Sequence, residues 1–199
     1  MEPLAPKILN HAKALPEGTP VCAKELLHLG ERSAVDQALC RLASTGALMR
    51  VGRGLYALPV QGKFGTRAPA VPKLMEGLAN LQGETIVPSG AASANSLGLT
   101  TQVPIKSVYL TSGRTRKLQL GKQEVELRHA PPWQLVLPGR IAGEVVRALA
   151  WMGPSECPEA LRTLSTRLPA AQLQEAASAR GRLPTWLAKG LSSWAGSHA

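Results

Sequence analysis

The stretch SAVDQALCRLASTGALMRVGRGLYALP, residues 33–59, constrains the fold most because its periodicity changes in the middle. In the first half, Val35, Leu39 and Leu42 are spaced i, i+4, i+7, which predicts a helix over residues 31–45 with one buried face. The second half alternates around Gly-Arg-Gly, which predicts two short strands joined by a tight turn. The chain must therefore hold a short helix followed directly by a small hairpin.

Two further helices are predicted before this stretch. Residues 4–15 place apolar side chains on one helical face, and the sequence PEGTP then ends that helix. Residues 23–30, AKELLHLG, predict a second helix that stops at Gly30. The order of three helices and a hairpin over residues 4–59 predicts a winged helix-turn-helix. In that arrangement the third helix reads base edges in the DNA major groove, and the hairpin approaches the phosphate backbone or the minor groove.

A segment rich in glycine and proline follows the predicted hairpin. Residues 60–72, VQGKFGTRAPAVP, predict a linker whose two basic residues are also available to DNA. We therefore expect a winged helix-turn-helix DNA-binding domain over residues 1–59 and a second, mixed α/β domain over residues 73–199. The expected fold class is α+β.

The second region alternates between helical and strand patterns. Helices are predicted over residues 73–83, 91–99 and 139–153. Strands are predicted over residues 84–88, 106–113, 114–121 and 123–130, and the last two form a hairpin around Gly121 and Lys122. The remaining sequence predicts two or three helices between residues 156 and 194, interrupted at Pro158, Pro169 and Pro184.

The charge balance indicates a polyanionic partner. The chain has 23 Lys and Arg residues against 13 Asp and Glu, and the net charge of +10 favours nucleic acid first and an anionic membrane surface second. Residues 61–138 hold nine basic and four acidic residues, and SGRTRKLQLGK is their densest basic segment. Its basic residues are Arg114, Arg116, Lys117 and Lys122. This segment is either a second nucleic-acid contact surface or an ordinary solvated strand and loop.

Residues suited to catalysis are scarce. Asp36 is the only aspartate beside twelve glutamates, and it either caps the predicted helix together with Ser33 or pairs with a neighbouring arginine. The sequence has no G-x-S-x-G, no G-x-x-x-x-G-K-[ST] and no H-E-x-x-H motif. No two cysteines have metal-ligand spacing. We expect a binding protein rather than an enzyme, with no catalytic residue, metal or cofactor.

The remaining composition favours a cytoplasmic protein. No apolar run reaches about 18 residues, and residues 1–18 have neither an apolar block nor a small-residue cleavage site, so we expect no membrane partner and no secretory signal. Three scattered cysteines build no disulfide framework, and Cys22 and Cys40 are expected to be small buried residues. Core or interface anchors are expected at Trp151, Trp186 and Trp194.

Two segments together resemble a known family. Residues 33–59 resemble the N-terminal winged helix of AbiEi-type antitoxins. The segment VPSGAASANSLGLTTQVPIKSVYLTSGRTRKLQLGKQEVELRHAP, residues 87–131, resembles the region that follows in that group. That region has a strand, a small-residue helix ending in Leu-Gly-Leu, and strands leading to a basic hairpin. The resemblance spans residues 8–153.

The resemblance implies a transcriptional autorepressor that is the antitoxin of a type IV toxin–antitoxin pair. Such a protein binds inverted repeats in its own promoter through the winged domain, and its C-terminal domain supplies antitoxin activity and a basic surface. The toxin of that family is nucleotidyltransferase-like and need not form a stable complex with the antitoxin. We expect a monomer in solution or a weak dimer on double-stranded DNA.

The residues that match the family's DNA-contact positions lie in the predicted third helix and hairpin. They are Arg32, Ser33, Gln37, Arg41, Arg50 and Arg53. The other predicted DNA contacts are Lys24, Arg114, Arg116 and Lys117. Two other functions stay open: a stand-alone transcriptional regulator without a toxin, and an RNA-binding or toxin-neutralising module that uses the basic C-terminal domain.

Overall fold

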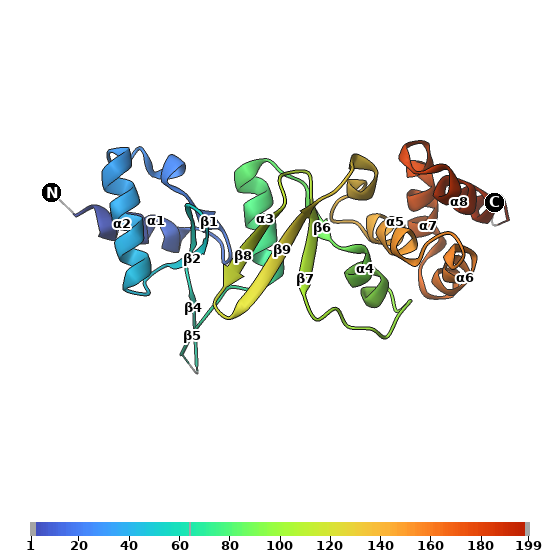
Figure 1. Ribbon diagram of the computed structural model, residues 1–199, viewed down its shortest axis with the longest axis horizontal. Coiled ribbons are helices and arrows are strands. Elements are labelled where there is room, and N and C mark those ends of the chain that lie inside the picture. The colour runs from blue at the N-terminus through green and yellow to red at the C-terminus, as the bar shows by residue number, and fades with distance from the viewer. Residues whose placement is uncertain (1–2, 64, 198–199) are drawn as a thin grey trace. The chain divides into compact units, whose positions relative to one another are not determined.

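The computed structural model of the protein describes residues 3–63 and 65–197. Short strands occur in runs that are separated by helices, and the last part of the chain is helical, so the fold class is α+β, as predicted (Figure 1). The first elements are α1 (Leu4–Ala14), β1 (Pro20–Val21), the 3-10 helix η1 (Ala23–Leu26), α2 (Arg32–Ser44), β2 (Met49–Gly52), β3 (Leu55–Ala57), β4 (Val60–Gly62), β5 (Gly65–Arg67) and α3 (Val71–Gln82). The later elements are β6 (Ile86–Pro88), α4 (Gly90–Ser96), β7 (Ser107–Thr111), β8 (Arg116–Leu120), β9 (Gln123–His129), η2 (Pro132–Leu135), α5 (Ile141–Met152), α6 (Cys157–Arg167), α7 (Ala170–Ser178), η3 (Ala179–Arg182) and α8 (Thr185–Ser197).

The chain divides into two compact units. Unit 1 comprises Met1–Glu84 and Arg116–Glu126, and unit 2 comprises Thr85–Thr115 and Leu127–Ala199. Strand β9 therefore begins in unit 1 and ends in unit 2. The units differ from the predicted domains because unit 1 includes α3, β8 and the start of β9. The predicted division at residues 60–72 stays a prediction.

The core of unit 1 is built where the sequence pattern placed it. Val35 and Leu39 on α2 are fully buried, and they pack with Ile8 of α1 and Leu26 of η1. The helical periodicity over residues 31–45 is thus confirmed. Beside these helices lies an antiparallel sheet in the order β1-β3-β2.

The predicted helix over residues 23–30 is shorter than expected. Only η1 forms, as one 3-10 turn, because the backbone N–H of Glu25 donates to the carbonyl of Cys22 and the Cys22 N–H donates to the Glu25 carboxylate. The N–H of Leu29 then donates to the Leu26 carbonyl, which closes another tight turn before α2 begins. Hydrogen bonds between residues three positions apart are typical of such short connecting segments.

Helix α3 packs directly on the N-terminal core. A Cβ added to Gly77 would lie 2.9 Å from the Cα of Thr19, and one added to Gly18 would lie 2.8 Å from the backbone of Lys73. Two glycines therefore let the helix approach β1 closely. The carboxylate of Glu17 also accepts from Lys73 Nζ over 2.7 Å, and this hydrogen bond lowers the pKa of Glu17.

The expected linker contains a hairpin. Strands β4 and β5 pair in antiparallel register from Val60 opposite Arg67 to Gly62 opposite Gly65. The Arg67 guanidinium lies 3.7 Å from the Glu17 carboxylate, within unit 1.

Unit 2 begins with a small sheet followed by packed helices. Strand β6 pairs antiparallel with β7, and β7 neighbours the end of β9. Leu97-Gly98-Leu99 follows the last residue of α4, and there Gly98 adopts φ +70° and the N–H of Leu99 donates to the Ala94 carbonyl. This six-residue closure is a Schellman motif, which explains why the small-residue helix stops at this sequence.

The last helices surround a second apolar core. It contains Leu149 of α5, Leu164 of α6, Leu173 of α7 and Leu187 of α8, all with no exposed side-chain surface. Pro158 lies in the first turn of α6 rather than interrupting a helix, because a missing N–H is harmless there. Trp194 is buried in this core and Trp186 packs against it, as predicted, and the remaining predicted anchor, Trp151, is 45 % exposed.

Candidate nucleic-acid interface

Helix α2 exposes a polar face opposite its buried residues. Gln37 and Arg41 are both exposed, and together with Asp36 and Cys40 they line a surface depression of about 390 Å³. The two side chains carry hydrogen-bond donors, so this face has the chemistry needed to contact base edges or phosphates. The predicted exposure of Gln37 and Arg41 is confirmed, whereas no observation tests what they bind.

Asp36 pairs with an arginine on the same helix. Arg32 Nε donates to the Asp36 carboxylate over 2.8 Å, one helical turn away, and both side chains are about half exposed. The alternative, a capping box between Ser33 and Asp36, is wrong, because α2 starts at Arg32 and its N-cap residue is Glu31. Ser33 is exposed in the first turn.

Strand β2 places Arg50 beside the same helix. Arg50 pairs with Tyr56 across the β2–β3 register, and the Tyr56 hydroxyl lies 3.5 Å from Cys40 Sγ on α2. Residues paired in an antiparallel register share one face of the sheet, so Arg50 projects on the side that faces α2. Burial raises the pKa of Tyr56, and its hydrogen bond with Cys40 raises it further. Cys40 itself is exposed and Cys22 is only partly buried, which corrects the expectation that both are buried.

Arg53 occupies the tip of the β2–β3 hairpin. Gly52 pairs with Leu55, so the connecting turn consists of Arg53 and Gly54. Gly54 adopts φ +67°, a conformation that glycine reaches without strain, and Arg53 is exposed. The sequence prediction of an arginine at a glycine-flanked turn is confirmed in its position.

A basic strand from later in the sequence lies next to this hairpin. Arg50 of β2 and Lys117 of β8 line a common surface depression of about 320 Å³ in unit 1. A Cβ added to Gly52 would lie 3.0 Å from Leu118 Cδ2, so the two strands are in close contact. Lys117 Nζ also lies 3.0 Å from the Glu124 carboxylate, and the lysine side chain stays 63 % exposed.

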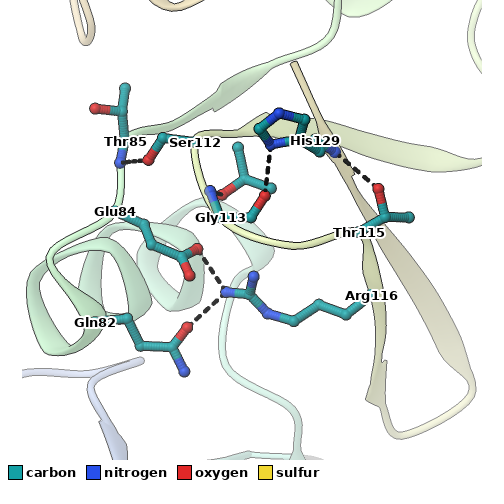
Figure 2. Close-up of polar contacts among 9 residues, drawn as sticks. Gln82, Glu84, Thr85, Ser112, Gly113, Thr115, Arg116 and His129 are labelled. Carbon is teal, nitrogen blue, oxygen red and sulfur yellow. Dashed lines mark hydrogen bonds and ion pairs between the residues drawn. The ribbon is translucent and has the colours of Figure 1, made fainter. Parts of the chain in front are cut away.

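The remaining candidate in β8, Arg116, is held within unit 1. Figure 2 shows its guanidinium between two acceptors: Nη2 donates to Glu84 over 2.8 Å and to Gln82 over 2.6 Å. The side chain is 23 % exposed, and that of Glu84 is 19 % exposed. These contacts tie β8 to the end of α3, which is a structural role that its sequence position did not indicate.

Arg114 lies in unit 2, within a loop that is fixed by hydrogen bonds. Ser112 Oγ accepts from the N–H of Thr85, and Thr115 Oγ1 accepts from the N–H of His129 (Figure 2). The His129 ring donates from Nδ1 to the Gly113 carbonyl over 2.8 Å. Arg114 is exposed on this loop.

Five residues of unit 1 form what we call the basic surface: Gln37, Arg41, Arg50, Arg53 and Lys117. The contact of Tyr56 with Cys40 connects its helical part to Arg50, and the common depression connects Arg50 to Lys117. Four of the five side chains are cations, which suits a surface that neutralises phosphates. Lys24 is exposed on η1, outside this set.

The described residues contain neither a candidate metal site nor a candidate membrane-spanning helix. Residues 3–63 and 65–197 contain no group of three or more His, Cys, Asp or Glu side chains arranged to hold a metal ion. None of the helices in these residues is both long and apolar enough to cross a membrane.

The comparisons with known proteins give one match. A family model described as "Family of unknown function (DUF6088)" matches residues 7–168. Neither the curated proteins nor the solved structures include a match to this chain. Because the family model covers most of the sequence, including the basic surface, the chain belongs to the DUF6088 family, whose function is unknown.

Proposed function

We propose that the protein is a sequence-specific double-stranded DNA-binding repressor that acts on its own promoter. The single observation that carries this proposal is the basic surface of unit 1, where the outer face of α2, the β2–β3 hairpin and β8 present exposed cations together. The order α1, η1, α2, β2, β3 and the pairing of β1 with β3 support a winged helix-turn-helix arrangement.

The parts of the basic surface have different roles in this proposal. Gln37 and Arg41 project from a rigid helix, and side chains of these types form bidentate contacts with adenine and guanine edges. Arg50, Arg53 and Lys117 lie on strands and a turn, where they neutralise phosphates and set the position of the duplex. Base contacts of the helix confer specificity, and phosphate contacts supply affinity that falls as salt rises.

We further propose that the repressor is the antitoxin of a type IV toxin–antitoxin pair in the cytoplasm. The support is the resemblance of residues 33–59 and 87–131 to AbiEi-type antitoxins. If a neighbouring gene encodes a nucleotidyltransferase-like protein, co-expression should relieve growth inhibition by that protein alone. Growth that stays inhibited would favour a stand-alone regulator.

A panel of nucleic acids tests the DNA-binding proposal. The full chain should bind a duplex from upstream of its own gene more tightly than a scrambled duplex, a single strand or a structured RNA of equal length. Two inverted half-sites should bind two copies, whereas the protein alone should sediment as a monomer. Tighter binding to structured RNA than to any duplex would contradict the proposal and favour the RNA-binding alternative.

A further inference from the structure

A cavity in unit 2 has cationic walls. It is open to solvent and has a volume of about 430 Å³, and its lining includes Lys106, Arg128 and Arg147 but, among the described residues, no Asp or Glu. A cavity of this size falls within the range of about 300–1,000 Å³ that is typical of small-molecule sites. Three cations around one cavity favour an anionic occupant.

Arg147 on α5 is the most unusual of these residues. Its side chain is 1 % exposed, and its Nη1 donates to the Val136 carbonyl over a long 3.4 Å. Its Nε and Nη2 are buried without a hydrogen-bond partner among the described residues. Burial lowers the pKa of Arg147 to about 10, an effect that the charge of Glu144 opposes, so the group is still a cation at neutral pH. Buried N–H donors and charges are costly when nothing accepts from them.

The cavity has a closely packed wall and an aromatic side. A Cβ added to Gly90 would lie 2.7 Å from both the Arg147 carbonyl oxygen and Trp151 Cβ, so α4 and α5 are held closely together there. Trp151 lines the cavity and is 45 % exposed, although tryptophan is a residue that proteins tend to bury. Gln134 adds an amide to the lining.

We propose that this cavity binds a nucleoside monophosphate, either free or as the terminal nucleotide of a nucleic acid. The phosphate lies with Lys106 and Arg128, the two exposed cations of the lining, because a guanidinium matches phosphate oxygens with two parallel hydrogen bonds. The buried Arg147 adds a positive charge to the same lining. The base stacks on Trp151, an interaction that tolerates different bases because each has a π-face. This site is in unit 2 and does not depend on the DNA binding proposed for unit 1.

Calorimetry with the full chain tests the chemistry of the occupant. The probes are adenosine and guanosine monophosphates, inorganic phosphate, ribose 5-phosphate and adenosine. A nucleoside monophosphate should bind at least about tenfold more tightly than ribose 5-phosphate, which lacks the base, or adenosine, which lacks the phosphate. The reason is that stacking and charge-assisted hydrogen bonds each contribute a factor of about ten or more to the affinity. Equal binding of phosphate and nucleotide would overturn the nucleotide assignment, and no binding of any probe at millimolar concentration would overturn the site.

Variants locate the binding. Lys106→Gln and Arg128→Gln change exposed residues and should each weaken nucleotide binding about tenfold, whereas the matched control Arg182→Gln, an exposed cation outside the cavity, should leave it unchanged. Trp151→Leu should remove the preference for nucleotide over ribose 5-phosphate. Arg147→Met removes a buried positive charge and should weaken nucleotide binding while retaining the fold, as checked by circular dichroism. Binding that survives both exposed variants would place the nucleotide elsewhere and overturn the proposal.

A short oligonucleotide separates the two sources of the ligand and keeps this test apart from the DNA-binding test. A trinucleotide with a terminal phosphate should compete with the free nucleotide if the ligand is a nucleic-acid end, and its hydroxyl-terminated form should not. If the ligand is a free nucleotide, neither form competes. Gln37→Ala in unit 1 should leave nucleotide binding unchanged, so failure of one proposal is distinguishable from failure of the other.

Discussion

At the scale of single residues, the only aspartate of the sequence lies on the face proposed to meet DNA. Asp36 repels phosphate and holds Arg32 in an exposed ion pair. Asp36→Asn should therefore increase affinity for operator and scrambled duplexes alike by about two- to fivefold, since a charge pair at about 4 Å in water is worth about 1 kcal/mol. Freeing Arg32 should also steepen the salt dependence by about one unit.

Fluorescence anisotropy across a salt series measures both effects. The stability of Asp36→Asn should change by less than about 1 kcal/mol, because exposed ion pairs contribute little. Unchanged affinity for every duplex would mean that this face of α2 does not approach phosphate.

A glycine on α3 decides how closely that helix packs. Gly77→Ala brings a Cβ to 2.9 Å from Thr19 Cα, where backbone rather than a flexible side chain must move. We expect the free energy of unfolding to fall by about 1–3 kcal/mol, the usual cost of overpacking. Chemical denaturation measures this, and Gly181→Ala, which meets no atom within 4 Å, is the control. Equal stabilities of the two variants would contradict the close packing of α3 on β1.

At the scale of elements, two neighbouring cations on β8 have opposite roles. Arg116 is largely buried and bonded to Glu84 and Gln82, whereas the Lys117 side chain is 63 % exposed beside Arg50. Arg116→Ala should therefore lower the free energy of unfolding by about 1–3 kcal/mol. Lys117→Ala should leave stability nearly unchanged and weaken DNA binding equally for all sequences, with a salt slope lower by about one unit.

Thermal unfolding and duplex titration of both variants separate these roles. If Arg116→Ala is as stable as the native chain, its ion pair is not structural. If Lys117→Ala binds DNA normally, the alternative interpretation of this segment as an ordinary solvated strand is correct.

Local patterns predicted most elements but not the contacts between distant ones. The spacing of Val35, Leu39 and Leu42 predicts the buried face of α2, because these side chains recur at the helical period. The Gly-Arg-Gly sequence predicts the turn of the β2–β3 hairpin. The contact of β8 with β2 joins residues that are more than sixty positions apart, and no periodicity encodes it. Arg116 and Lys117 are adjacent cations in sequence, so only the packing of their surroundings distinguishes them.

At the scale of the whole molecule, the open question is whether the N-terminal segment folds alone. In the structure α3 covers β1 through Gly18 and Gly77, and β8 covers β2, all within unit 1. A fragment of residues 1–59 lacks both α3 and β8. We expect it to unfold at a clearly lower temperature than a fragment of residues 1–126, as measured by circular dichroism. Equal stability would support the predicted domain boundary at residues 60–72.

The most direct test of the central proposal compares the helix with the hairpin in DNA binding. Gln37→Ala and Arg41→Ala remove exposed side chains from α2, and Arg53→Ala removes the cation at the hairpin tip. A good base contact discriminates by about 1–3 kcal/mol, whereas a phosphate contact does not discriminate at all. Arg182→Gln is the control for loss of charge elsewhere.

The measurement is the affinity of each variant for operator and scrambled duplexes over a series of salt concentrations. The account predicts that each α2 variant lowers the ratio of operator affinity to scrambled-duplex affinity by about tenfold. Arg53→Ala should weaken binding to both duplexes and preserve this ratio, and the slope of affinity against salt concentration should fall by about one unit. If the α2 variants keep the full ratio, helix α2 does not read the DNA sequence and the proposed function is wrong.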